Sequence, residues 1–111
     1  MEFETKEIQK ALVITITGVE NLAAYNSKEL RENLLRLTEP NTSLVIDLSA
    51  ISYLDSSGIG TLIGVKKELE KRGGDVRLTG INPGVQAIFD TIRAHRVFEM
   101  YGSVQEAAES Y

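Results

Sequence analysis

Hydrophobic and polar residues alternate with two different periods along the chain. Residues 8–17 are rich in β-branched side chains and end in a regular apolar and polar alternation, which is typical of a strand with one buried face. Residues 3–7 are expected to form a short partner strand, with the turn at Gln9 and Lys10. Gly18 is expected to end the pair.

Four segments carry apolar residues at helical spacing. The first starts with Asn26 or Ser27 as its cap. The second follows Asp55 and ends in a cluster of cations and two glycines, as the helix dipole and its caps favour. The third and fourth span residues 83–94 and 104–110. The positions expected to face inward are Leu30, Leu34, Leu35 and Leu37, then Ile59, Leu62, Ile63 and Leu69, then Val85, Ile88, Phe89 and Ile92.

Short apolar runs at residues 43–48, 75–79 and 97–101 predict three further strands. The first run is nearly continuous, as expected for a central strand that is covered on both faces. The order is therefore β-β-α-β-α-β-α-β-α, which predicts an α/β fold. Because the later connections can each hold a helix, their strands should be parallel and joined by right-handed crossovers.

Composition narrows the classes of function. The net charge of −4 argues against nucleic-acid binding, which needs a basic surface to displace counterions from phosphates. The chain has no cysteine, so disulfides, thiolate catalysis and cysteine-ligated metals are excluded. An apolar secretion core and a run of about 18 apolar residues are both missing. These features predict a cytoplasmic protein without a membrane partner.

Residues with candidate functional side chains lie between the central strand and the second helix. Asp47, Asp55, Ser56 and Ser57 lie at or near this point, and ligands or partners of α/β sheets bind at the carboxyl ends of the strands. Asp-Ser-Ser-Gly before a helix is also an ordinary N-cap. If Asp55 is the cap, its carboxylate should accept from the N–H of Ser57 or Gly58, which leaves Ser56 at the outer rim of the turn.

Three enzyme interpretations fit poorly. The glycines from Gly58 to Gly64 are misplaced for a dinucleotide loop, since the third comes one residue late and the strand ends too far before them. A serine hydrolase would need a base, and the single histidine, His95, is predicted to be exposed or to cap a helix end. Asp47 and Asp55 have no histidine or cysteine to complete a metal site.

Gly60 and Gly64 lie four residues apart and therefore share one face of the second helix. Each glycine costs about 0.8–1 kcal/mol relative to alanine in a helix interior, so close approach of another backbone is expected at this face. That backbone could belong to this chain or to a partner helix, and the sequence does not separate the two.

Residues 47–60 read Asp-Leu-Ser-Ala-Ile-Ser-Tyr-Leu-Asp-Ser-Ser-Gly-Ile-Gly. They resemble the signature of the STAS domain in anti-sigma factor antagonists, in which Asp-Leu-Ser is followed by an aromatic residue, an apolar residue and Asp-Ser-Ser/Thr-Gly-Leu-Gly. Residues 73–74, 82–83 and 88–90 fit the family as well. The resemblance implies one STAS domain over residues 1–111, with a mixed, mostly parallel sheet of four to five strands and helices packed mainly on one face.

The resemblance also implies a function. In the family, the serine directly after the aspartate is phosphorylated, and this position is Ser56. An ATP-dependent anti-sigma factor serine kinase adds the phosphate, a metal-dependent serine phosphatase removes it, and the unphosphorylated antagonist binds the kinase so that the sigma factor is released. The chain would be a substrate and not an enzyme, without a cofactor or metal of its own. The partner-binding residues would be Asn21, Asp47, Asp55, Ser56, Ser57, Gly58, Gly60, Thr61 and Gly64.

One segment departs from the family. Relatives usually have Gly-Glu-Leu-Asp after the second strand, whereas residues 18–21 read Gly-Val-Glu-Asn and a loop two residues longer follows through Tyr25. The acidic position often borders the partner surface, so either Asn21 or a displaced Glu20 takes its place.

Two other functions remain open from the sequence. A STAS scaffold subunit of a transporter or stress-sensing complex would associate stably whatever the state of Ser56. A small-ligand or nucleotide-binding sensor would be stabilised thermally by its ligand without a partner.

Overall fold

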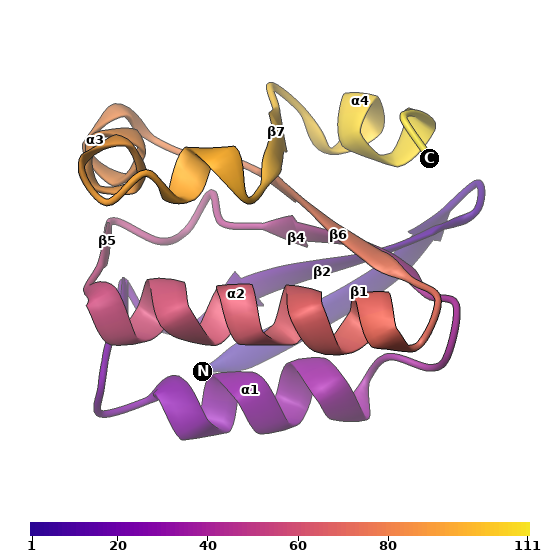
Figure 1. Ribbon diagram of the computed structural model, residues 1–111, viewed down its shortest axis with the longest axis horizontal. Coiled ribbons are helices and arrows are strands. Elements are labelled where there is room, and N and C mark those ends of the chain that lie inside the picture. The colour runs from indigo at the N-terminus through magenta and orange to yellow at the C-terminus, as the bar shows by residue number, and fades with distance from the viewer.

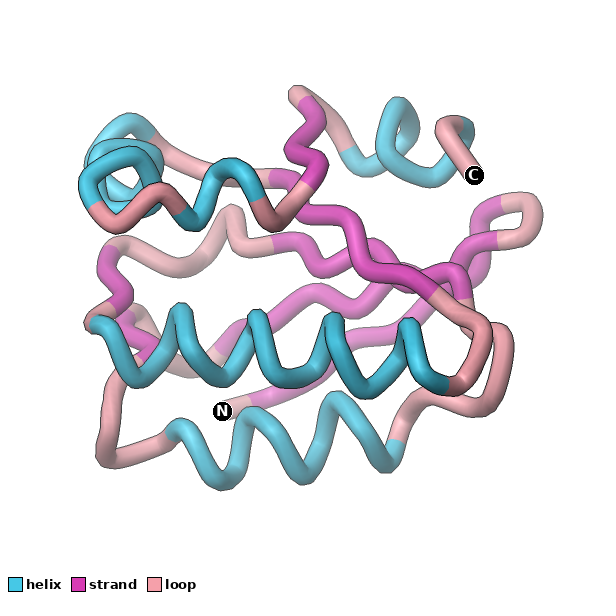
Figure 2. Tube along the Cα trace, in the orientation of Figure 1, coloured by secondary structure: helices cyan, strands magenta, loops and turns pink.

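A five-stranded sheet forms the centre of the computed structural model, which describes residues 1–111. The strands lie in the order β1-β2-β4-β6-β7. β1 pairs antiparallel with β2, and every other pair is parallel, so the sheet is mixed and mostly parallel as predicted (Figures 1 and 2). The strands are β1 (Glu2–Ile8), β2 (Ala11–Thr17), β4 (Ser43–Asp47), β6 (Asp75–Thr79) and β7 (Glu99–Tyr101).

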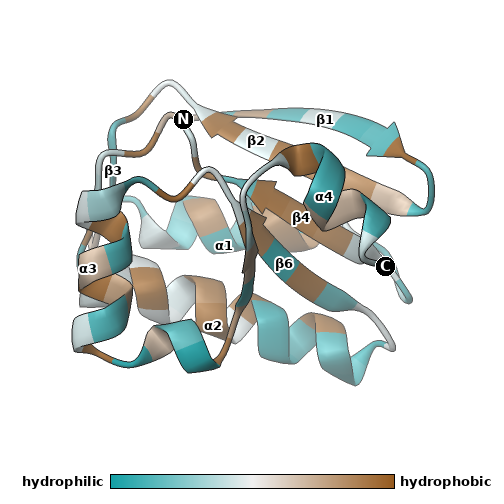
Figure 3. Cartoon of the chain, turned by 90° about the horizontal axis from the view of Figure 1, so that it is seen from above, coloured by the Kyte–Doolittle hydropathy of each residue, from teal (hydrophilic) through white to brown (hydrophobic).

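The helices lie mainly on one face of this sheet. α1 (Ser27–Arg36) and α2 (Ser56–Lys71) run side by side over it (Figure 1). α3 (Pro83–Thr91) lies beyond the carboxyl ends of the strands, and α4 (Val104–Glu109) packs on the opposite face (Figure 3). None of these helices combines the length and the apolar character needed to cross a bilayer.

Strand β4 shows why the central run is apolar throughout. Leu44 and Ile46 belong to the main core of 20 buried residues, which α1, α2 and α3 cover. Val45 points to the other face, where it packs with Ala107 and Ala108 of α4. Because successive side chains of a strand point to opposite faces, two cores require apolar residues at consecutive positions.

The end of the chain fixes α4 against the sheet. The Tyr111 hydroxyl donates to the carbonyl oxygen of Leu44 at 2.6 Å, and the Arg77 guanidinium lies 3.9 Å from the centre of the Tyr111 ring. Burial raises the pKa of the Tyr111 hydroxyl. The phenol therefore stays protonated and can keep donating.

Helix α2 carries one buried cation. Lys66 is one of the cations in the second half of this helix, and the structure buries it, with Nζ 2.5 Å from Asp75 Oδ1. Burial by itself would raise the pKa of Asp75, but hydrogen bonds from Lys66 and the Val76 N–H, together with the charge of Lys66, hold it below its usual value. This pair joins α2 to the start of β6.

Three predicted boundaries are wrong. The turn predicted at Gln9 and Lys10 is confirmed, but the strand predicted at residues 8–17 overlapped it, and β2 begins at Ala11. The helix predicted to reach Ala94 ends at Thr91, because Arg93 adopts a left-handed conformation with φ of 60° and a short 3-10 helix, η1 (Ala94–Arg96), follows. The last strand starts at Glu99 and not at Val97. Ile92, predicted to face inward, is 48% exposed at this break.

A second small sheet was not predicted. β3 (Asn21–Leu22) pairs parallel with β5 (Tyr53–Leu54), away from the main sheet. Two-residue strands are too short to show an alternating pattern, and β5 lies in what the sequence indicated as a loop. This sheet holds the segments before α1 and before α2 next to each other (Figure 2).

Candidate functional site

The predicted site residues are brought to the carboxyl-end edge of the sheet by two connections. After β4, the chain passes through β5 directly into Asp55 and the first turn of α2. After β2, it passes through β3 and a loop at residues 23–26 into α1. Backbone hydrogen bonds from Ser52 to the Glu20 carbonyl at 2.7 Å and from Asp55 to the Leu22 carbonyl at 3.1 Å join these connections.

The carboxylate of Asp55 forms hydrogen bonds with both the first turn of α2 and the loop before α1. Its Oδ1 accepts from the backbone N–H of Gly58 at 2.9 Å, which confirms the predicted N-cap. Its Oδ2 accepts from the N–H of Ala24 at 3.2 Å, a contact that the sequence did not indicate. The hydrogen bond from Gly58, with further N–H groups including that of Ala24, lowers the pKa of Asp55. The carboxylate is therefore ionised at neutral pH.

Gly58 is required by close packing. A Cβ atom at this position would lie 2.8 Å from the carbonyl carbon of Leu22, and nearer still to its oxygen. Real Cβ atoms essentially never come that close to backbone, so a larger residue would push the first turn of α2 away from β3. The family resemblance implied that Gly58 belongs to the partner-binding residues, but the structure buries it within the chain.

The two serines differ in exposure. Ser56 is the first residue of α2 and is exposed, and its hydroxyl makes no hydrogen bond. Ser57 is half-buried, and its backbone carbonyl accepts from the Thr61 hydroxyl at 2.9 Å. Ser56 therefore differs from Ser57 by its greater exposure, at a turn whose first N–H groups are not all used by the helix.

Asp47 lies at the end of β4 and has its own hydrogen-bond partners. Its Oδ1 accepts from the Ser49 N–H at 3.0 Å, and its Oδ2 lies 3.3 Å from the Thr15 hydroxyl, which donates to it. It shares no hydrogen bond with Asp55 or with either serine. Asp47 therefore stabilises the end of β4, whereas Asp55 stabilises the first turn of α2.

Gly60 and Gly64 do not meet another backbone of the chain. No atom lies within 4 Å of the place where a Cβ of Gly60 would stand. Near Gly64 only the Arg31 side chain, the flexible end of a residue of α1, comes within this range, at 3.1 Å. The interpretation that packing within the chain requires Gly60 is wrong.

The loop at residues 23–26 contains residues that the sequence did not assign to the site. Asn26 occupies the cap position of α1 but makes no cap bond. Its buried side chain instead accepts from the Ala23 N–H and donates to the Asn21 carbonyl, both at 2.9 Å. Tyr25 beside it is 73% exposed, and Tyr53 of β5 is 50% exposed. Neither tyrosine lies in a segment with a periodic pattern, so the sequence does not indicate whether it is buried or exposed.

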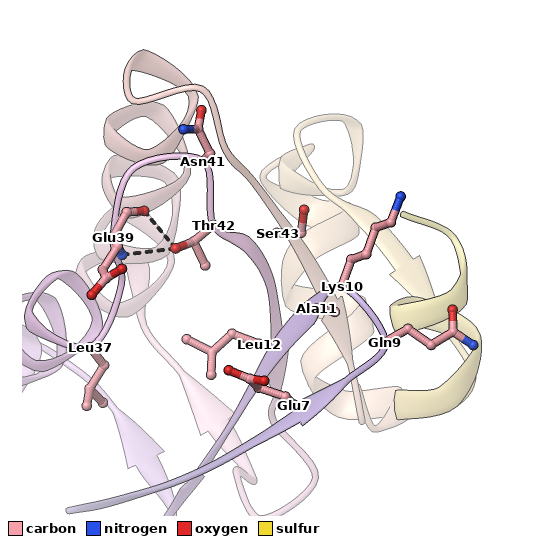
Figure 4. A pocket seen from close by; sticks show the side chains of 10 residues that line it. All are labelled: Glu7, Gln9, Lys10, Ala11, Leu12, Leu37, Glu39, Asn41, Thr42 and Ser43. Atoms are coloured by element: carbon pink, nitrogen blue, oxygen red, sulfur yellow. Dashed lines mark hydrogen bonds between the residues drawn. The ribbon is translucent and has the colours of Figure 1, made fainter.

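The hollows of the surface lie elsewhere. One of about 380 Å³ lies at the β1–β2 turn and the start of β4, where Lys10, Glu39 and Thr42 are among its lining residues (Figure 4). A second, of about 260 Å³, is lined by residues of the β6–α3 connection, α3 and the end of β7. Neither hollow includes a predicted site residue. His95 is exposed near Asp90 and far in the sequence from both serines.

Comparison with known proteins identifies similar chains. The model of the STAS domain family matches residues 2–107. The anti-sigma-B factor antagonist of Bacillus subtilis (strain 168) is 31% identical over 87 residues, which cover 78% of this chain and 78% of that relative.

Two solved structures share the fold. An anti-sigma-factor antagonist (STAS) domain protein from Planctomyces limnophilus has a TM-score of 0.86 at 18% identity, with 97% of this chain and 96% of that chain covered. The anti-sigma factor antagonist SpoIIAA in its unphosphorylated form has a TM-score of 0.64 at 20% identity, covering 98% of this chain and 96% of that chain.

Proposed function

The chain belongs to the STAS domain family, and on this premise we propose that it is an anti-sigma factor antagonist whose binding is switched off by phosphorylation of Ser56. In the unphosphorylated state it binds an anti-sigma factor kinase and thereby frees the sigma factor. The name of the Bacillus subtilis relative supports the general function. The observation that carries the switch is the exposed, unbonded Ser56 hydroxyl at the start of α2.

The role of the chain in this reaction is that of a substrate. A kinase needs a hydroxyl that it can align with the γ-phosphate of ATP, and Ser56 is more accessible than Ser57. The proposed partners are therefore an ATP-dependent serine kinase and a metal-dependent serine phosphatase.

A phosphate at Ser56 is compatible with the fold. It would bring a charge of about −1.5 to −2 to a helix N-terminus, where backbone N–H groups and the helix dipole favour an anion. The ionised Asp55 next to it opposes this gain by repulsion. These opposing effects leave the fold intact, so the added charge acts mainly on a protein surface that approaches this edge.

The docking surface extends from Ser56 along the open side of α2. Gly60 is exposed and has free space around its Cα. A helical glycine costs about 1 kcal/mol relative to alanine, and packing within the chain does not account for that cost. Close approach of a partner helix does. In this arrangement Thr61 and Gly64 border the contact, whereas Asp55 and Gly58 act by positioning the turn.

Calorimetry with the purified anti-sigma factor tests the switch. We expect Ser56→Ala to bind as tightly as the unmodified chain and to be insensitive to ATP, and Ser56→Asp to bind poorly. Thr5→Asp adds the same charge on exposed β1, away from this edge, and should bind normally. Equal affinities of Ser56→Ala and Ser56→Asp would contradict a charge-based switch and favour a scaffold subunit.

Fragmentation mass spectrometry tests the choice of serine. After incubation with the kinase and ATP, trypsin leaves Ser56 and Ser57 in one peptide that follows Arg36 and ends at Lys66. Only fragment ions that separate the two serines assign the phosphate. Phosphate on Ser57 alone would overturn the assignment to Ser56.

A further inference from the structure

The two most exposed large hydrophobic side chains flank the start of α2. Tyr25 is 73% exposed and Tyr53 is 50% exposed. Tyr53 is two residues before Asp55, and Tyr25 follows Ala24, whose N–H donates to the Asp55 carboxylate. The segments that carry Tyr25 and Tyr53 therefore meet at Asp55, which directly precedes Ser56.

The loop that presents Tyr25 is fixed by its own hydrogen bonds. The Asn26 side chain bonds to Ala23 and to Asn21. The Asn26 N–H donates to the Ala23 carbonyl at 3.1 Å, and the Ser27 hydroxyl donates to the Ala24 carbonyl at 3.2 Å. Together with the hydrogen bond from Ala24 to Asp55, five hydrogen bonds order the loop at residues 23–26. The side chain of Tyr25 in this loop is nevertheless exposed to solvent.

An exposed aromatic side chain on an ordered loop is typical of a binding surface. Asn26 gives up the capping of α1 to order the loop, although a cap typically contributes about 1 kcal/mol. An aromatic side chain on an ordered loop loses little further entropy when a partner covers it. Tyrosine is also among the residues that most often dominate binding energy, since its ring is apolar and its hydroxyl can donate.

We propose that Tyr25 is an anchor residue for the anti-sigma factor, held beside Ser56 through Asp55, and that the loop at residues 23–26 contributes to the choice of partner. The inference rests on the proposed function. The complementary surface would be an apolar pocket with a hydrogen-bond acceptor at its end for the phenol. Because the same carboxylate bonds to Ala24 and to Gly58, this pocket and the region that meets Ser56 must lie on one partner surface.

Site-specific photo-crosslinking tests the position of the partner. A benzophenone amino acid is placed at residue 25, at residue 60 on the open side of α2, or at residue 10 in the β1–β2 turn at the opposite edge (Figure 4). Cells of the source organism are irradiated and the adducts are identified by peptide mass spectrometry. We expect an ATP-binding anti-sigma factor to be captured from residues 25 and 60 and not from residue 10.

Capture from residue 60 alone would overturn the anchor role of Tyr25 and leave the proposed function standing. If neither residue 25 nor residue 60 captures an anti-sigma factor, the proposed function fails, and this inference fails with it.

Calorimetry with the captured anti-sigma factor, purified, measures the contribution of Tyr25. We expect Tyr25→Ala to weaken binding roughly 30-fold, as for an interface hot spot, and Tyr25→Phe to lose much less. Ile92→Ala removes another exposed apolar side chain, 48% exposed, and should bind normally. Unchanged affinity of Tyr25→Ala, with Ser56→Asp still weakened, would overturn the inference alone. Thermal unfolding of Tyr25→Ala should match that of the unmodified chain, because this side chain packs little within the protein.

Discussion

Gly58 and Gly60 lie two residues apart in the same helix and have opposite surroundings. Gly58 faces the carbonyl of Leu22, and no side chain fits there. Gly60 faces open space, and any small side chain fits. The comparison teaches that the Asp-Ser-Ser-Gly-Ile-Gly motif combines two sets of residues. Asp55 and Gly58 build the turn, whereas Ser56 and Gly60 are free of the fold and available to a partner.

The largest expected effect on stability comes from the side of α2 that packs against the main core. Leu62 is fully buried in the main core. We expect Leu62→Ala to lower the free energy of unfolding by about 3 kcal/mol, because it removes buried methyl groups and leaves a cavity. Urea unfolding at pH 7 measures this value. The exposed Lys67→Ala is the control on the open side, and a loss of similar size there would contradict the assignment of the two sides.

Gly58→Ala should also destabilise the fold. Alanine is favoured in helices, but its Cβ would meet the backbone of Leu22, so we expect a net loss of about 2 kcal/mol from overpacking. Hydrogen exchange should show faster opening of the first turn of α2 in this variant. Stability equal to that of the unmodified chain would mean that β3 can move away without loss.

Gly60→Ala should have the opposite sign. Since a Cβ at this position meets nothing, we expect the free energy of unfolding to rise by about 0.8–1 kcal/mol through helix propensity. The same variant should bind the anti-sigma factor more weakly. A variant that is more stable and binds normally would show that no partner backbone approaches Gly60.

A smaller effect is expected from pH at the ion pair of α2. The pKa of Asp75 is lowered in the folded chain, so its contribution to stability is complete above about pH 4, its ordinary pKa, and is lost as the pH falls through the lowered value. Asp75→Asn should therefore destabilise the protein at pH 7 and have less effect near pH 3. Urea unfolding at both pH values tests this, with the exposed Glu4→Gln as the control. A pH-independent difference would contradict the role of the charge.

The sequence analysis predicted the elements whose apolar residues follow directly from the burial of the element in the core. β6 was predicted with its observed boundaries, and β4 differs by one residue. Val76 and Leu78 of β6 are buried in the main core, and β4 contributes to the cores on both faces. The cap of α2 by Asp55 was also predictable, since it depends on residues three apart. The break at Arg93 was not, because nothing in residues 83–94 marks a residue that adopts positive φ.

The predicted site was correct where contacts are local and incomplete where they are distant. The contact of Asp55 with Ala24 joins residues 31 apart, and that of Gly58 with Leu22 spans a similar length of chain. The periodicity of apolar residues along the sequence does not indicate contacts between residues so far apart. For the same reason, the sequence left open what lies against Gly60, whereas the structure shows that nothing in the chain does.

The two bonds of the Asp55 carboxylate have a consequence for the order of folding. The body of α2 is stabilised by local hydrogen bonds and by the nearby core. Its first turn also needs contacts with β3 and the loop at residues 23–26, which are separated from α2 in the sequence by α1 and β4. Closing so long a loop precedes any gain from the contact. We therefore expect this turn to form late in folding, so that mutations there speed unfolding more than they slow refolding. The turn that carries Ser56, the proposed phosphorylation site, is thus expected to become rigid last.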